Sequence, residues 1–178
     1  MKPDEAQARF RLGMFTSDAL VALADSWLEQ GMFTESLGHL FSIKNAEMAD
    51  VGPLFESALK ELGEPDFTRQ EAANVLAKIT LHQIATGEVN AVEGAEFLYW
   101  KVHQAITDEL PVHKYLGDNL GLEEVFCWLR EIWDCRDGSM ILYHMDLPRD
   151  QAEAKFIEHL IEAARNWRNK TAHNQPPH

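Results

Sequence analysis

The chain of 178 residues lacks any hydrophobic run long enough to cross a bilayer. Its longest apolar stretches are only a few residues, as in Met140-Ile141-Leu142-Tyr143. The first thirteen residues, MKPDEAQARFRLG, place charges where a secretion signal needs an apolar segment. The sequence therefore predicts a cytoplasmic protein that makes no use of a membrane.

Cysteine is also scarce, since the chain contains only Cys127 and Cys135. Both fall within one predicted helix, where a rise of roughly 12 Å over eight residues exceeds the span of a disulfide. Their neighbours Phe126, Trp128 and Trp133 are aromatic. We therefore predict that both thiols are reduced, buried and unreactive.

Positive charge is in short supply: 16 Lys and Arg stand against 29 Asp and Glu, for a net charge of −13. The shortage lies before Pro148, because residues 149–178 contain slightly more bases than acids. Such a field repels phosphate backbones at long range and attracts positively charged surfaces. It predicts a basic protein as partner and disfavours nucleic acid except near the C-terminal tail.

Alternating strand patterns with hairpin turns are missing, whereas apolar residues recur at spacings of three and four. This periodicity predicts an all-α fold, an irregular bundle of six to seven helices. The whole chain, 1–178, is expected to form a single domain with 1–15 and 174–178 as flexible ends. Amphipathic helices of this kind can pack against a second copy of the chain, so the sequence is also compatible with a homo-oligomer.

Capping residues locate the predicted helices. Starts are expected at Thr16 to Asp18, Thr34, Asp50, Thr68 to Glu71 and Asn90, and ends at Gly31, Gly63, Gly87 and Gly138. The phrase GMFT occurs at 13–16 and 31–34, each time with a threonine that can cap. The stretch MILYHMDL, 140–147, fits a helical continuation or a short buried strand, and the helix is favoured. Pro148 suits the first position of the last helix.

Sequence signatures of catalysis and metal binding are absent. The chain has no G-x-S-x-G elbow, no phosphate-binding glycine loop, and no HxxxH, CxxC or ExxH nucleus. Glu35 and His39 are spaced as a single ligand pair, but a surface ion pair explains that spacing better. The aromatic residues Phe97, Tyr99 and Trp100 predict core packing. We therefore assign no catalytic residue, cofactor or metal.

One short string near the C-terminus has a mechanistic reading: Arg168, Asn169 and His173 form R-N-x-x-x-H. It resembles the signature of the higher-eukaryote and prokaryote nucleotide-binding (HEPN) superfamily, all-helical domains that include metal-independent ribonucleases. The resemblance implies that Arg168 stabilises a phosphate, Asn169 orients the site and His173 acts as acid or base, across a dimer. The alternative is a frayed helix end whose basic residues complement the helix dipole.

Residues 18–105 carry a second resemblance, in ALVALADSWLEQGMFTESLGHLFSI, SALKELGEP and IATGEVNAVEGAEFLYW. These segments resemble a recurring plan among small acidic bacterial proteins, some of which sit beside toxin genes and are similar to immunity proteins. The resemblance implies a non-catalytic protein-binding module, immunity- or antitoxin-like, with an acidic face for its partner. That function is our first hypothesis, and the ribonuclease is the alternative.

Overall fold

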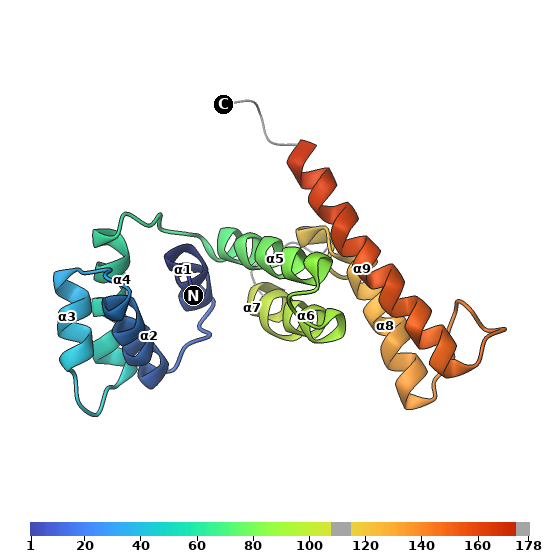
Figure 1. Ribbon diagram of the computed structural model, residues 1–178, viewed down its shortest axis with the longest axis horizontal. Helices are drawn as coiled ribbons and strands as arrows, with labels where there is room; N and C mark the ends of the chain where they lie inside the picture. The colour runs from blue at the N-terminus through green and yellow to red at the C-terminus, as the bar shows by residue number, and fades with distance from the viewer. Residues whose placement is uncertain (108–114, 174–178) are drawn as a thin grey trace. The chain divides into compact units, whose positions relative to one another are not determined.

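The computed structural model describes residues 1–107 and 115–173, and for 168–173 the backbone alone. Every regular element in these ranges is a helix, which confirms the all-α prediction (Figure 1). Contacts divide the chain into two compact units, Met1–Val75 and Leu76–His178. The single domain remains a prediction.

Unit 1 is built from α1 (Pro3–Arg11), α2 (Ser17–Glu29), α3 (Glu35–Ser42) and α4 (Met48–Glu61). Helices α2, α3 and α4 pack against one another around a core that contains Leu20, Trp27, Leu37, Leu40 and Phe55. Helix α1 lies within the stretch predicted to be flexible, yet its Ala6 and Ala8 are fully buried. The Trp27 indole also donates to the carbonyl of Met1 at 3.0 Å, which ties down the start of the chain.

Most predicted caps form as expected. Thr16 accepts from the amide of Ala19, and Thr34 from that of Leu37. Thr68 and Glu71 form a reciprocal capping box at the start of α5 (Arg69–Thr86), with contacts of 2.8 and 3.2 Å. The cap predicted at Asp50 is wrong, because α4 begins at Met48 and Glu47 occupies the N-cap position. Asp50 instead lies in the first turn, where a carboxylate complements the positive end of the helix dipole.

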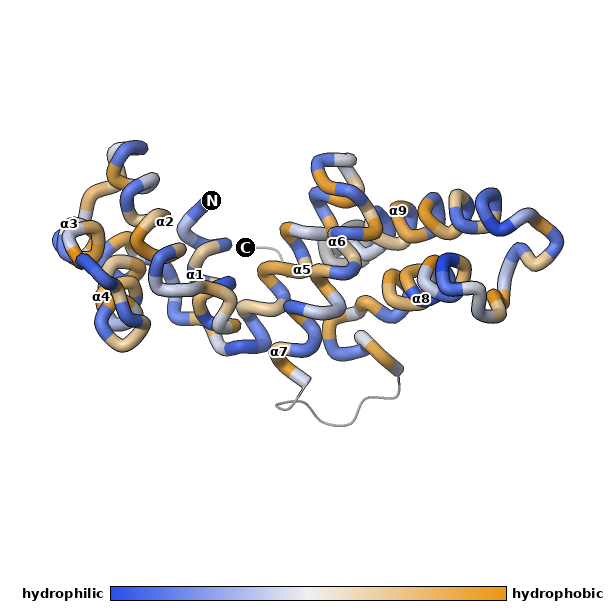
Figure 2. The backbone as a smooth tube through the Cα atoms, turned by 90° about the horizontal axis from the view of Figure 1, so that it is seen from below, coloured by the Kyte–Doolittle hydropathy of each residue, from blue (hydrophilic) through white to orange (hydrophobic). Residues whose placement is uncertain are grey.

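Unit 2 contains the rest of α5 and helices that follow it in the sequence. These are α6 (Ala91–Phe97), the π-helix η1 (Leu98–His103), α7 (Gln104–Ile106), the 3-10 helix η3 (Asp118–Leu120), α8 (Glu123–Asp137) and α9 (Arg149–His173). Helix α8 packs against α9, and α6 contacts both. Figures 1 and 2 show α8 and α9 side by side, and the loop that connects them extends past the ends of both helices.

The π-helix places its aromatic residues differently from the core packing that was predicted. Tyr99 packs edge-on against Trp133, with ring centroids 5.1 Å apart. Trp100 instead is 56% exposed and stacks on the Trp133 ring, with centroids 5.8 Å apart. Leu98, Val102 and Ile106 are fully buried and form the inward face of this segment. Trp100 lies off that face, because adjacent residues of a helix point about 100° apart.

Gly117 lies in a left-handed conformation against α8, with φ of 84°. A Cβ atom there would lie 2.7 Å from the Phe126 ring and 3.1 Å from the backbone of Leu122. We therefore expect Gly117→Ala to lower the free energy of unfolding by about 2–4 kcal/mol, measured by chemical denaturation. Gly138→Ala is the matched control, because Gly138 has φ of 86° and open space around it. An equal loss in both variants would contradict the predicted clash.

Candidate functional site

Residues 139–147 connect α8 to α9 as an irregular loop, so the helical continuation predicted for MILYHMDL is wrong. Gly138 adopts a left-handed conformation that ends α8. His144 is also left-handed, with φ of 53°, and its carbonyl accepts from the amide of Leu147 at 3.0 Å. These two backbone conformations interrupt any helix, since only isolated residues adopt the left-handed region.

The loop exposes four large apolar side chains. Met140, Leu142, Tyr143 and Met145 are 76%, 62%, 48% and 71% exposed, whereas Ile141 between them is buried. We call these four residues the loop surface. Leaving a large apolar side chain in water forgoes roughly 1.5–3 kcal/mol of burial free energy. Gathering four such side chains within six residues is typical of a surface that another molecule covers.

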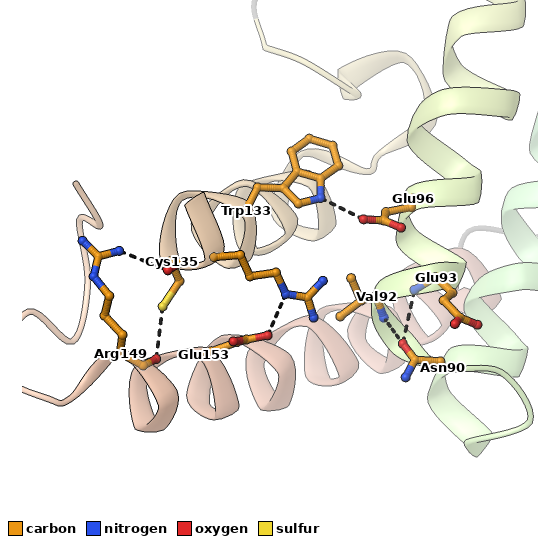
Figure 3. Close-up of polar contacts among 9 residues, drawn as sticks. Asn90, Val92, Glu93, Glu96, Trp133, Cys135, Arg149 and Glu153 are labelled. Atoms are coloured by element: carbon orange, nitrogen blue, oxygen red, sulfur yellow. Dashed lines mark hydrogen bonds and ion pairs between the residues drawn. The ribbon is translucent and has the colours of Figure 1, made fainter. Parts of the chain in front are cut away.

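Arg149, at the start of α9, holds the base of the loop. Its guanidinium donates to four carbonyl oxygens at 2.8 to 3.1 Å, those of Asp134, Cys135, Gly138 and Ser139. Figure 3 shows the side chain reaching back to α8, and the Cys135 thiol donating in the opposite direction to the Arg149 carbonyl at 3.1 Å. One planar fork of donors therefore satisfies carbonyls that the end of α8 leaves without helical partners.

Carboxylates of α8 hold two further backbone amides of the loop. Glu131 is only 3% exposed, and its Oε2 accepts from the Leu142 amide at 2.8 Å. Asp137 accepts from the Ser139 amide at 2.8 Å, and hydrogen bonds from Ser139 lower the pKa of this carboxyl. The backbone of Leu142 is thus fixed although its side chain is exposed. The loop surface is consequently presented in one defined conformation.

A histidine pair and a tryptophan complete the support of the loop. The Nε2 atom of His144 lies 3.2 Å from the Nε2 atom of His159 on α9. The Trp128 ring stacks on His159 with centroids 4.5 Å apart, and packs against Tyr143 at 5.2 Å. The loop therefore contacts both helices that it connects.

The surroundings of the loop surface are acidic. Residues 134–153 contain Asp134, Asp137, Asp146, Asp150 and Glu153. The two bases in this range are both engaged, since Arg136 pairs with Glu153 at 2.7 Å and Arg149 with the carbonyls. The stretch that contains the loop surface therefore carries more acids than bases, which suits a positively charged partner.

Arg168, Asn169 and His173, the residues of the HEPN-like string, all lie in the last two turns of α9. The helix is continuous from Arg149 to His173. At 100° per residue, positions 168 and 173 are about 140° apart around the axis. Their side chains lie outside the described residues, so the predicted ribonuclease roles remain predictions. Because one unbroken helix does not bring these two positions together, the ribonuclease hypothesis requires an arrangement across a dimer.

Cys127 is exposed, which corrects the prediction that both thiols are buried; Cys135 is buried as expected. Partial burial, followed by the charges of Glu131 and Glu124, raises the pKa of the Cys127 thiol. A raised pKa keeps the sulfur protonated at neutral pH, and a protonated thiol is a poor nucleophile and metal ligand. Among residues 1–107 and 115–167, no three His, Cys, Asp or Glu side chains are grouped to hold a metal ion.

Unit 1 has a hollow of about 170 Å³ lined by charged side chains that include Arg11, Lys60 and Glu64. Burial, followed by the charge of Asp4, raises the pKa of Glu64. The hollow is smaller than the roughly 300–1,000 Å³ of typical ligand pockets. It gives no support to an enzymatic site, and the loop surface is the stronger functional candidate.

No family model, curated protein or solved structure matches the chain. Within the described residues, no helix is long and apolar enough to span a membrane. No sequence motif marks the loop surface. Its signal in the sequence is an apolar run without helical periodicity, bounded by Gly138 and Pro148.

Proposed function

We propose that this chain is a non-catalytic protein-binding module that acts in the cytoplasm on a basic partner, in the manner of an immunity protein or antitoxin. The observation that carries the proposal is the loop surface: four exposed apolar side chains on a loop fixed by Arg149, Glu131 and His159.

The arrangement meets three requirements of a protein-docking site. Apolar and aromatic anchors supply most of the binding energy of protein interfaces. A loop that is already ordered loses little conformational entropy when it is bound. The acidic residues around the anchors, such as Asp146 and Asp150, speed encounter with a basic partner and exclude acidic ones. The partner is therefore expected to present an apolar pocket with a basic rim.

The test compares two triple variants of the full chain as bait. In one, Met140, Leu142 and Met145 of the loop surface are changed to serine. In the matched control, the exposed apolar residues Phe33, Phe41 and Met48 of unit 1 are changed to serine. The product of a neighbouring gene is the first candidate partner, tested as a purified protein.

We expect the loop variant to bind the purified partner at least about tenfold more weakly, a loss of roughly 1.4 kcal/mol. The control should bind like the wild type, and added salt should weaken wild-type binding because the charges are screened. Titration calorimetry at two salt concentrations gives both numbers. Unchanged affinity in the loop variant, or a loss equal to that of the control, would count against this docking site.

The ribonuclease remains the alternative hypothesis. It requires Arg168 of one chain and His173 of another to meet across a dimer. Purified protein incubated with RNA, beside Arg168→Ala and His173→Ala, discriminates between the two functions. Cleavage that both substitutions abolish would favour the ribonuclease over the binding module.

A further inference from the structure

The two histidines beneath the loop surface are positioned to share one proton. Their Nε2 atoms are 3.2 Å apart, their ring centroids are 5.4 Å apart, and their planes differ by 7°. The two rings are therefore nearly coplanar and meet at their Nε2 edges. A hydrogen bond between two imidazole nitrogens needs one N–H donor and one lone pair. The contact can form with at most one of the two rings charged.

We propose that His144 and His159 form a proton-operated latch that holds the loop surface in its docking conformation. A second proton places two cationic N–H groups against each other, so the contact breaks and the loop leaves α9. The closed loop thus carries at most one positive charge on the pair, and the open loop carries two, so the open form has bound at least one more proton. This regulation rests on the proposed function of the loop surface.

The direction of the pH dependence follows from this proton count. Because the open form binds more protons, the closed loop is favoured at higher pH and is lost as pH falls. Histidine is the side chain whose charge ordinarily changes between pH 5 and 8. Where the two forms differ by one bound proton, the ratio of closed to open loop falls about tenfold for each unit that the pH is lowered.

Other titratable residues lie close to the pair in the sequence or on the elements that carry it. They are Cys127 and Glu131 on α8, Tyr143 and Asp146 in the loop, and Glu158 and Glu162 on α9, with Lys155 one turn before His159. Carboxylates ordinarily titrate near pH 4, and thiols, phenols and amines above pH 8. Hydrogen bonding to Lys155 and then its charge lower the pKa of Glu158, whereas burial raises that of Cys127. The range from pH 7.5 to 5.5 therefore separates the ordinary range of histidine side chains from those of the other residue types.

The loop amides report the state of the latch without any partner. Leu142 donates to Glu131 and Leu147 to the His144 carbonyl, so both amides should exchange slowly in the closed loop. Hydrogen exchange of the full chain, followed by NMR and expressed as protection factors, corrects for the intrinsic pH dependence of exchange. We expect the protection of both amides to fall by roughly tenfold from pH 7.5 to 5.5.

Two variants separate the histidine pair from other causes. His159→Gln keeps a group that can donate to neutral His144 or accept from charged His144, so protection should change less than about twofold over the same range. His82→Gln, at an exposed histidine on α5, should keep the wild-type response. His144→Gln provides a second test, in which circular dichroism first confirms that the variant is folded.

The latch proposal would be overturned if the protection of the wild-type amides changed less than about twofold. It would also be overturned if folded His159→Gln and His144→Gln kept the wild-type pH response. The result is independent of the docking test, because the exchange experiment contains no partner and the docking comparison is made at pH 7.5. If protection falls with pH as expected but the loop variant binds the partner normally, the latch stands and only the proposed function is refuted.

Discussion

Phe55→Ala is expected to lower the free energy of unfolding of unit 1 by about 4 kcal/mol, within the roughly 3–5 kcal/mol typical of a buried aromatic residue. Phe55 is fully buried, and its ring contacts those of Phe10, Phe15 and Trp27, with centroids 5.1 to 6.0 Å apart. Alanine removes the shared contact of the three rings and leaves a cavity among them. Chemical denaturation followed by tryptophan fluorescence measures the loss.

Phe156→Ala is the matched variant in unit 2, because Phe156 is also fully buried. If the chain unfolds as the single predicted domain, both substitutions shift one common transition. If the units unfold independently, each substitution shifts only the transition of its own unit. A loss below about 1 kcal/mol in Phe55→Ala would contradict the importance assigned to the ring cluster.

Features that depend on neighbouring residues were predictable from the sequence. A cap joins a side-chain oxygen to an amide two or three residues later, as Thr34 does with Leu37 and Asn90 with Val92. The capping box of Thr68 and Glu71 is of the same kind. Apolar spacing likewise identifies α2 and α8, because a helix buries one face whatever it packs against.

The loop surface was not predictable in this way, because contacts distant in sequence hold it. Leu142 is fixed by Glu131, eleven residues earlier, and His144 by His159, fifteen residues later. Without those partners, an apolar run such as MILYHM is more simply read as buried structure. The exposure of Trp100 and Cys127 escaped prediction for a related reason, since burial depends on what packs against a helix and not on the helix alone.

Arg149→Ala is expected to weaken partner binding at least about tenfold, because the loop surface loses the contact that fixes its base. The guanidinium makes four hydrogen bonds to carbonyl oxygens of residues 134–139. Arg149 is exposed, and water can replace some of these bonds. The free energy of unfolding should therefore fall by only about 1–2 kcal/mol. Calorimetric titration with the partner and chemical denaturation measure the two effects.

The sign of the binding change distinguishes conformation from charge. Removing a positive charge makes an acidic surface more negative, so charge alone would strengthen binding to a basic partner. Loss of the loop conformation weakens it. Arg136→Ala is the matched control, since it removes the same charge but only one exposed ion pair, with Glu153. Tighter binding in both variants would show that the loop surface works through charge and does not depend on the conformation that Arg149 maintains.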